Sequence, residues 1–276
     1  KFGCEFLVRN ALVKDKAALG RWTRDQLIEL GPTFVKLGQI ASARSDLYPV
    51  EFVRELETLQ DEVPAVAYES IVDLIDESAF ETFDPEPFKS ASIGQVHRAT
   101  LRGGKDVVVK IRRPGIIETM REDTANVMEL VAFLDSIGID TGTGANNYVL
   151  VESVENLLKE CDYENEVVNA VQFRRNFKKV PWLKVPKVYR KLSGSDAIVM
   201  EYVASEKLGE ITDPRVNKKN VARALMRAYV MQTMHYGLFH ADPHPGNIGF
   251  RSANGGQLVF YDFGLCIPIS NELKEG

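Results

Sequence analysis

Three polar residues near the C-terminal end of the sequence have the types and spacing to hold a metal ion and orient a hydroxyl group. In "HADPHPGN" (240–247), Asp242 lies five residues before Asn247, and Asp262 of "DFG" follows fifteen residues after that Asn. Mg²⁺ is a hard cation that prefers carboxylate and amide oxygens. A carboxylate beside an attacking hydroxyl orients it and accepts its proton. The pattern therefore indicates phosphoryl transfer, with Asn247 and Asp262 as metal ligands and Asp242 as catalytic base.

Two histidines, His240 and His244, flank the first Asp and admit two interpretations. A zinc site is one of them, but Pro243 and Pro245 prevent a helix that would place both rings on one face, and no third nitrogen or sulfur ligand lies nearby in the sequence. Histidines that fix the conformation of the loop are the interpretation that we favour.

A second set of candidate residues lies in "KSASIGQV" (89–96) and in the strand that follows it. The kinase phosphate loop reads G-x-G-x-x-G-x-V and is followed by a strand lysine. Aligned on its Val, this segment has Lys89 and Ala91 at the first two glycine positions and Gly94 at the third. Lys110 follows in "VVVK" and fits the lysine that contacts nucleotide phosphates. A single Lys in an apolar strand can also be an edge residue that reaches to solvent, but the downstream motifs favour the phosphate contact.

A phosphate-binding lysine of this kind needs a glutamate partner, and the sequence offers three. Glu118 and Glu122 lie in "IIETMRED" (116–123), and Glu166 lies further along in "ECDYENE" (160–166). The residues alone leave this choice open.

The apolar periodicity predicts helices, then antiparallel strands, then helices and a final hairpin. The expected helices span 21–30, 33–45, 50–62, 68–78, 116–137, 148–178 and 218–237; the expected strands span 92–101 and 106–113, two strands within 185–203, and a hairpin from 248 to 264. This order predicts an α+β fold with two lobes. The expected divisions are a helical extension at 1–87, an N-lobe with inserted helices at 88–203, and part of a C-lobe at 204–276.

Composition and charge exclude several classes of protein. The chain has 276 residues, of which 45% are apolar and 26% charged, and its net charge of −5 gives no general case for nucleic-acid binding. Three widely separated cysteines indicate a reducing compartment. No apolar run approaches the roughly 18–20 residues needed to span a bilayer. Because the sequence begins within a pattern and without Met, we expect an excised domain, with targeting or membrane segments outside it.

The charge is unevenly distributed along the chain. Residues 55–88 hold eleven acidic and no basic side chains, whereas residues 174–191 hold eight basic and no acidic ones. Solvated surface is the simpler interpretation of both. Trp182 and Tyr189 interleave the basic stretch, and a second hypothesis is that this stretch meets anionic lipid headgroups.

The motifs together resemble those of the UbiB family of atypical kinase-like proteins, also called the ADCK group. The resemblance covers nearly the whole chain and rests on "KLGQ" (36–39), "SASIGQVHRA" (90–99), "VVVKIRRPG" (107–115), "ECDYENE" (160–166), "HADPHPGN" (240–247) and "DFG" (262–264). Ordinary kinases lack the KxGQ and ExD elements, so the motif set is specific. The resemblance implies a kinase-like fold with a helical extension packed on the active site and a truncated C-lobe.

The resemblance also implies roles for individual residues. Lys110 contacts phosphate and pairs with Glu166, while Asn247 and Asp262 hold Mg²⁺ and Asp242 occupies the catalytic-base position. Nucleotide-binding positions are the gatekeeper Met200, the hinge residues Glu201 and Val203, and the loop residues Lys89, Ser90, Ala91, Ser92, Ile93 and Gly94.

The KxGQ residues Lys36 and Gln39 belong to a helix that the resemblance places over the peptide-substrate site, which the ExD residues Glu160 and Asp162 also face. We expect Lys36 to meet these carboxylates and the Gln39 amide to face carboxylates and phosphates. Gly38 between them would allow close backbone approach.

As to function, the resemblance implies an atypical kinase or ATPase that binds Mg²⁺ with ATP or ADP and supports isoprenoid-quinone or prenyl-lipid metabolism. The implied partners are quinone or prenyl-lipid precursors, quinone-biosynthesis proteins and an anionic membrane surface. A eukaryotic member would be mitochondrial or plastidic, and a bacterial one would lie at the inner face of the cytoplasmic membrane. The alternatives are a nucleotide-binding regulator without phosphoryl transfer and a small-molecule phosphotransferase.

Overall fold

The computed structural model describes most of the chain, which forms two compact units. The described residues are 3, 5–6, 9, 12–42, 45, 48–60, 64–136, 156–243, 246–252 and 255–270. Unit 1 comprises Lys1–Val72, Glu86–Val96 and Arg112–Cys161, and unit 2 comprises Asp73–Pro85, His97–Ile111 and Asp162–Gly276. The expected domain divisions after residues 87 and 203 stay predictions.

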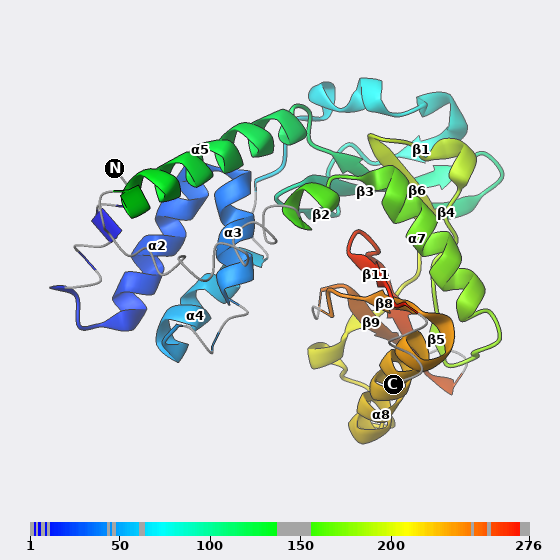
Figure 1. The fold of residues 1–276 in the computed structure, drawn as a ribbon. Helices are drawn as coiled ribbons and strands as arrows, with labels where there is room; N and C mark the ends of the chain where they lie inside the picture. Colours follow the sequence, from blue (N-terminus) through cyan, green and yellow to red (C-terminus); the bar gives the residue numbers. More distant parts are fainter. Residues whose placement is uncertain are drawn as a thin grey trace. The chain divides into compact units, whose positions relative to one another are not determined.

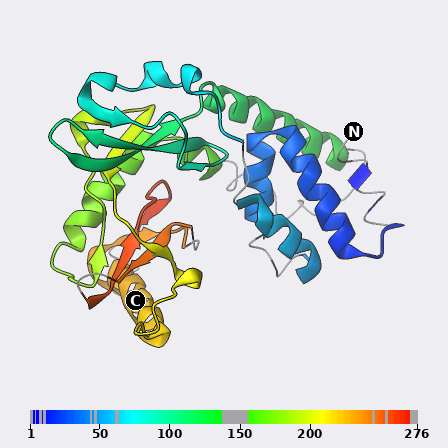
Figure 2. The same ribbon diagram turned by 180° about the vertical axis from the view of Figure 1, so that it is seen from behind.

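Unit 1 is mainly helical (Figures 1 and 2). Its elements are α2 (Lys16–Leu30), α3 (Pro32–Ser42), α4 (Val50–Glu57), the 3-10 turns η1 (Thr58–Gln60) and η2 (Tyr68–Ser70), the short strand β2 (Lys89–Ser90) and α5 (Ile116–Ser136). Asp15 caps the start of α2 by accepting a hydrogen bond from the Ala18 amide, and Gly31 ends the helix at a φ of 109°. Pro32 then occupies the first position of α3, as the sequence predicts.

The core of unit 1 forms where α2, α3 and α4 pack together, beside α5 in Figure 1. Its buried members are Leu19, Leu27, Val35, Phe52, Leu56 and Leu59. Gly38 on α3 lies at the closest point of this packing. A Cβ atom added there would lie 2.5 Å from a methyl carbon of Leu59 and 2.7 Å from one of Leu27. The predicted close approach at Gly38 is therefore confirmed, since any larger residue would displace both leucines.

An antiparallel sheet carries the strand lysine of the candidate site. It runs in the order β1 (Phe80–Phe83), β3 (Gly94–Leu101), β4 (Lys105–Arg112) and β6 (Ala197–Glu201), with β2 paired to β3. In β4 the buried residues Val107, Val109 and Ile111 alternate with the partly exposed Lys110. Because successive side chains of a strand point to opposite faces, this alternation holds Lys110 on the face opposite the three apolar side chains.

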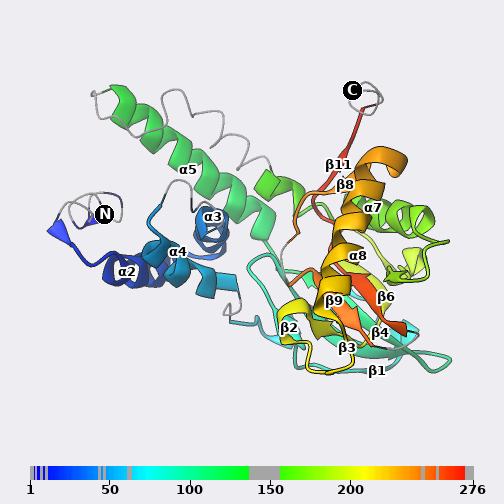
Figure 3. The ribbon, with the colours of Figure 1, turned by 90° about the horizontal axis from the view of Figure 1, so that it is seen from below.

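The rest of unit 2 combines helices with short strands, and α8 packs on β10 (Figures 1 and 3). These elements are η4 (Glu77–Ala79), α7 (Tyr163–Asn176), β5 (Leu183–Lys184), η5 (Arg190–Leu192), β7 (Glu206–Lys207), η6 (Leu208–Glu210), α8 (Lys218–Met231), η7 (Gln232–Tyr236), β8 (Leu238–His240), β9 (Ile248–Arg251), β10 (Gln257–Phe260) and β11 (Cys266–Pro268). β5, β10, β9 and β7 form a second sheet, and β8 pairs with β11.

Aromatic packing joins α7 to the strands near the C-terminal end. The Phe173 ring centroid lies 4.9 Å from that of Phe177, 5.5 Å from that of Phe260 and 5.1 Å from that of Phe263. The His240 ring lies edge-on to Phe173 at 6.2 Å. These buried rings fix the positions of two candidate segments, the one around His240 and the one that contains Phe263 of the DFG sequence.

Several predicted elements are confirmed within a few residues, and three predictions are wrong. The helix expected at 68–78 is instead a series of 3-10 turns, η2, η3 (Val72–Leu74) and η4. Local side-chain bonds compete with the helix there, because Ser70 donates to the Ala67 carbonyl and Asp76 accepts from the Ser78 amide. The helix expected at 218–237 is confirmed, as α8 and the π-helix that continues it from Gln232.

The other two corrections concern residues 148–203. The helix expected at 148–178 is not continuous, because Asp162 leaves the helical conformation to cap α7. The first part of this expected helix, to residue 155, lies outside the described residues. Within 185–203 only β6 is a strand, and η5 replaces the first of the two expected strands, leaving an isolated bridge between Val188 and Met200. The α+β class itself is confirmed. Among the described residues, no helix combines the length and apolar character needed to cross a membrane.

Candidate active site

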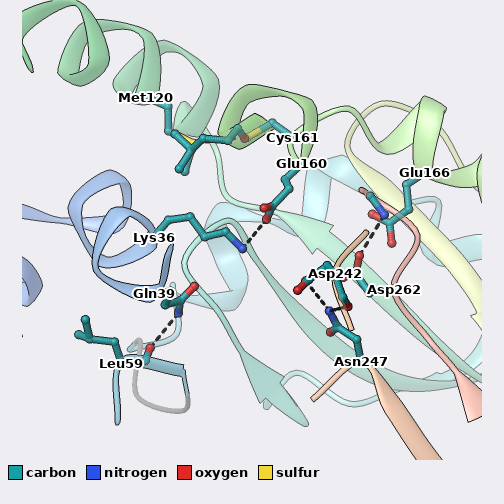
Figure 4. Close-up of polar contacts among 12 residues, drawn as sticks. Lys36, Gln39, Leu59, Met120, Glu160, Cys161, Glu166, Asp242, Asn247 and Asp262 are labelled. Atoms are coloured by element: carbon teal, nitrogen blue, oxygen red, sulfur yellow. Dashed lines mark hydrogen bonds and ion pairs between the residues drawn. The ribbon is translucent and has the colours of Figure 1, made fainter. Parts of the chain in front are cut away.

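The centre of the candidate site is a lysine held by two carboxylates within unit 2. Lys110 Nζ lies 2.7 Å from Glu166 Oε2, 2.9 Å from Glu166 Oε1 and 2.9 Å from Asp262 Oδ2. The three residues come from β4, from the first turns of α7 and from the segment after β10. Of the three glutamates that the sequence offered, the structure pairs Glu166 with Lys110. Figure 4 shows the side chains of Glu166 and Asp262 close to each other.

Burial and charge act together on these three groups. Burial and the neighbouring charge of Asp262 raise the pKa of Glu166 to about 7, although Lys110 opposes this shift. Burial disfavours the charge of Lys110, yet Asp262 and Glu166 together raise its pKa well above the ordinary value. Burial likewise opposes ionisation of Asp262, but the Lys110 charge and the Gly264 amide lower its pKa. One ammonium faces two carboxylates, so the ionised cluster carries one excess negative charge.

The predicted catalytic loop brings Asp242 and Asn247 into direct contact. The side-chain amide of Asn247 donates to Asp242 Oδ2 at 2.6 Å, as Figure 4 shows. The backbone carbonyl of Asn247 accepts from the backbone amide of Tyr261 at 3.0 Å. This second bond ties the loop to the residue just before Asp262. The two halves of the predicted metal site are therefore linked through the backbone of the final hairpin.

His240 fixes this loop, as the favoured interpretation predicts. Its side chain is 1% exposed, its Nε2 bonds to the Asp262 carbonyl, and its backbone amide donates to Gln232 Oε1 at 2.8 Å. Burial lowers the pKa of His240, which favours the neutral ring. His244, the other histidine that flanks Asp242, lies outside the described residues. No group of three or more His, Cys, Asp or Glu side chains suited to a metal occurs in the part of the chain that the structure describes.

The predicted hinge follows the last strand of the main sheet. Met200 and Val203 are buried, at 8% and 7% exposure, and Met200 lies opposite Val108 of β4. The Glu201 carboxylate accepts from Lys184 Nζ at 2.6 Å, which lowers the pKa of Glu201 against the effect of partial burial. The side chain of Glu201 is thus engaged by the protein, consistent with a hinge role carried by the backbone.

The KxGQ residues form their contacts within unit 1. Lys36 Nζ lies 2.6 Å from Glu160 Oε2, with side chains only 16% and 20% exposed, so the predicted contact with Glu160 is confirmed (Figure 4). Gln39 differs from expectation, because its amide nitrogen donates to the Leu59 carbonyl at 2.9 Å instead of facing carboxylates or phosphates. Asp162, the other ExD residue, caps α7 by accepting from the Asn165 amide at 3.0 Å.

Glu160 is positioned by residues that the sequence did not single out. Arg112 donates to the carbonyl of the next residue, Cys161, at 2.9 Å. The Cys161 thiol is 1% exposed and lies 3.4 Å from the sulfur of Met120 on α5, as Figure 4 shows. The apolar spacing of the α5 segment marks Met120 as a core residue, but nothing in the sequence indicates its sulfur partner.

The segment 89–94 forms the tip of a β-hairpin in unit 1. Ser90 pairs with Gln95, and the Ala91 amide donates to the Gly94 carbonyl at 2.9 Å. Ser92, Ile93 and Gly94 are buried, whereas Lys89 and Ala91 are exposed.

A strand lysine paired with a helix glutamate, beside a DFG Asp and a spaced Asp–Asn pair, defines a kinase-like protein. The model of the ABC1 atypical kinase-like domain matches residues 58–276. The chain belongs to this family, and its resemblance to the UbiB or ADCK group is thereby confirmed.

Comparison with individual proteins agrees with this assignment. An uncharacterized protein of Synechocystis, sll1770, is 40% identical over 92% of this chain and 45% of its own length. The Arabidopsis protein ACTIVITY OF BC1 COMPLEX KINASE 8, chloroplastic, is 36% identical over 95% of this chain and 36% of its own length. This chain therefore spans less than half of either relative. Among solved structures, Rv3197 of Mycobacterium tuberculosis in complex with erythromycin has a TM-score of 0.63 at 26% identity, covering 77% of this chain and 54% of its own.

The first prediction concerns the Lys36–Glu160 ion pair. Because both side chains are largely buried, we expect Lys36→Met or Glu160→Gln alone to lower the free energy of unfolding by about 1–3 kcal/mol. The double variant should lose less than the sum, with a coupling energy of about 1–2 kcal/mol in a double-mutant cycle measured by urea unfolding. The exposed pair Lys207–Glu210 is the control, with an expected coupling below about 0.5 kcal/mol. Equal coupling for the two pairs would contradict the prediction.

The second prediction concerns the pH dependence of stability at Glu166. Its pKa is raised from 4.5 to about 7 in the folded chain, so between these values the folded state binds a proton that the unfolded state has released. This group therefore makes the wild type less stable as pH rises from about 4.5 to 7. Glu166→Gln should gain stability relative to wild type across this window, by up to about 3 kcal/mol.

Unfolding free energies measured at pH 5, 6 and 7 test this expectation. Glu164→Gln, on the same turn of α7 but exposed, controls for the loss of one negative charge at the helix N-terminus. If the difference between Glu166→Gln and wild type does not grow with pH, the assigned titration is wrong.

Proposed function

We propose that the chain is the nucleotide-binding part of an atypical kinase or ATPase that uses Mg²⁺ with ATP or ADP. The observation that supports this most strongly is the placement of Lys110 between the Glu166 and Asp262 carboxylates. An ammonium fixed in this way presents a positive charge at a set position, which suits contact with nucleotide phosphates. Glu166 positions the Lys110 side chain.

The residues proposed to hold Mg²⁺ fit a hard cation. Asn247 commits its amide nitrogen to Asp242, and this bond orients the amide and leaves its oxygen as the remaining donor atom to a metal. The Asp262 side chain is 35% exposed while it also accepts from Lys110, and a carboxylate has lone pairs for a further partner. When bound, Mg²⁺ would neutralise phosphate charge. A divalent cation would also balance the excess negative charge of the ionised Lys110 cluster.

The remaining groups have proposed roles in binding and proton transfer. Asp242 orients the attacking hydroxyl or water and accepts its proton, and its hydrogen bond with Asn247 holds it in place. Adenine lies against Met200 and the backbone of Glu201 and Val203. The hairpin tip formed by Lys89, Ser90, Ala91, Ser92, Ile93 and Gly94 covers the phosphates.

The KxGQ helix is proposed to restrict access of a protein substrate, as the family resemblance implies. Lys36 and Gln39 on this helix, with Glu160 and Asp162 of the ExD motif, would form the restriction. The Lys36–Glu160 ion pair and the bond from Gln39 to Leu59 support a fixed position of α3 within unit 1. A chain that binds nucleotide but transfers no phosphate remains the alternative, and family membership speaks against a small-molecule phosphotransferase of another class.

For the whole protein we propose a role in isoprenoid-quinone or prenyl-lipid metabolism, with quinone or prenyl-lipid precursors and quinone-biosynthesis proteins as partners. Relatives named as chloroplastic favour a plastid for a eukaryotic member over a mitochondrion. For a bacterial member we propose the inner face of the cytoplasmic membrane.

The basic stretch 174–191 is proposed to meet an anionic membrane surface. Its side chains border a hollow of about 230 Å³ that Arg174, Lys178 and Lys184 line together with apolar residues. Basic side chains beside apolar surface suit a headgroup with attached acyl chains.

The third prediction tests the nucleotide site. Mg²⁺ with ATP or ADP at about 100 times the Kd should stabilise the wild type by about 2.7 kcal/mol in thermal unfolding. Asp262→Asn should lose the Mg²⁺-dependent part of this gain because a carboxylate ligand is removed. Asp213→Asn, at a partly buried acid paired with Arg215, should keep it. If Mg²⁺ causes no shift in the unfolding temperature of the nucleotide-bound wild type, the proposed nucleotide site is wrong. ATP hydrolysis by the wild type but not by Asp242→Asn would distinguish a catalyst from a regulator.

The fourth prediction tests the membrane surface. The triple variant Arg175→Gln, Lys178→Gln, Lys179→Gln removes three exposed charges from the basic stretch. At roughly 1 kcal/mol per near-surface basic residue, its binding to anionic vesicles should weaken by about a hundredfold in a flotation assay. The triple variant Lys105→Gln, Lys218→Gln, Lys219→Gln removes the same charge from exposed sites elsewhere and should bind as the wild type does. Equal wild-type binding to neutral and anionic vesicles would refute the proposal.

A further inference from the structure

Arg113 forms three hydrogen bonds with the hairpin tip 89–94. Its backbone amide donates to the Ile93 carbonyl at 2.9 Å, and its Nε donates to the Ala91 carbonyl at 3.0 Å. Its guanidinium also donates to Ser90 Oγ at 3.0 Å. One residue, some twenty positions away in the sequence, therefore bonds to three successive parts of the hairpin tip.

The same guanidinium also bonds to a segment of the helical extension. Arg113 Nη2 lies 2.6 Å from the Pro64 carbonyl. Two residues later, Val66 is held by Gln95, whose amide accepts from the Val66 N–H at 2.9 Å and donates to the Val66 carbonyl at 3.2 Å. Gln95 is 1% exposed, so this two-point contact is shielded from water. Segment 64–66 and the hairpin tip are thus joined by side chains from β3 and from the residue after β4.

The geometry of these contacts requires a guanidinium. On the hairpin tip and at Pro64, Arg113 bonds to carbonyl and hydroxyl oxygens, so these contacts depend on directed N–H groups. Arginine presents five donors in a rigid planar fork, whereas lysine presents a single point charge on a flexible stem. A lysine at this position would keep the charge and lose the simultaneous contacts to Pro64, Ala91 and Ser90.

The composition of the hairpin tip explains why these Arg113 contacts, called the clasp below, are useful. A phosphate loop built from glycines brings its backbone close to the nucleotide at the cost of large conformational freedom. Here Lys89 and Ala91 stand at two of the glycine positions, and Arg113 bonds the carbonyls of Ala91 and Ile93. These bonds direct the carbonyls of Ala91 and Ile93 toward Arg113. The other peptide groups of the hairpin tip are then left to contact a ligand.

We infer that Arg113 is a positioning residue that sets the conformation of the hairpin tip 89–94 for phosphate contact and couples it to segment 64–66 of the helical extension. This inference rests on the proposed nucleotide site. The chain is also bonded to the KxGQ helix five residues before Pro64, where the Leu59 carbonyl accepts a hydrogen bond from Gln39.

Hydrogen exchange of the nucleotide-free protein tests the clasp by itself. The variants are Arg113→Met and Arg113→Lys, with Arg121→Met on the exposed face of α5 as the control. Both Arg113 variants should raise exchange about tenfold in peptides that cover 64–72 and 86–95, with no change in peptides from α2 or α8. Unchanged exchange in both peptides, or a rise throughout the molecule, would overturn the clasp.

Binding of Mg²⁺–ATP and of adenosine then tests the positioning role. Both Arg113 variants should raise the Kd for Mg²⁺–ATP about tenfold and leave the Kd for adenosine unchanged, because adenosine has no phosphate to meet the tip. Equal loss for both ligands would indicate a general structural effect and overturn the role. Wild-type affinity in Arg113→Lys would also overturn it, by assigning the effect to charge. Failure of the wild type to bind either ligand refutes the proposed function and with it the positioning role, while the exchange result still decides the clasp.

Discussion

The buried cluster of one ammonium and two carboxylates around Lys110 is the interaction on which unit 2 depends. It joins strand β4, which carries Lys110, to the first turns of α7 and to the DFG segment. Glu166 of α7 lies 56 residues after the lysine in the sequence, and Asp262 of the DFG segment lies 152 residues after it. Removing two ions from water is costly, and Coulombic attraction offsets that cost only when the geometry is good. The three contacts at 2.7–2.9 Å meet this condition, and the aromatic packing of Phe173 and Phe263 holds α7 and the DFG segment together behind it.

Unit 1 depends on close helix packing and on a few polar ties. Gly38 lets α3 approach the leucines of α2 and η1, and α3 is also bonded to α5 through the contact of Thr33 with Asp123 at 2.6 Å. Lys36 and Gln39 add ties to Glu160 and to Leu59. The KxGQ sequence therefore has a structural role within its own unit, whatever it does toward a ligand.

The ExD motif shows how two nearby residues can acquire different roles. Glu160 ends its helical turn and pairs with Lys36, whereas Asp162 leaves the helical conformation and caps α7. The boundary between the units falls between Cys161 and Asp162. A continuous helix through 160–162, as apolar periodicity predicts, would have placed both carboxylates on one helix and removed the cap.

Local spacing in the sequence determined the α+β class, the Asp–Asn pair, the DFG aspartate and the strand lysine, because these features depend on neighbours in the chain. The partner of Lys110 stayed open among three glutamates until the family resemblance suggested Glu166. Tertiary structure alone decided the contacts of Arg113 with Pro64 and of Arg112 with Cys161, each between residues 49 positions apart, and the bond from Gln39 to a backbone carbonyl. An arginine or a glutamine has the same composition and periodicity whether it faces solvent, a phosphate or a buried carbonyl. Which of these it meets depends on how distant segments pack, and that packing is not encoded in any local pattern.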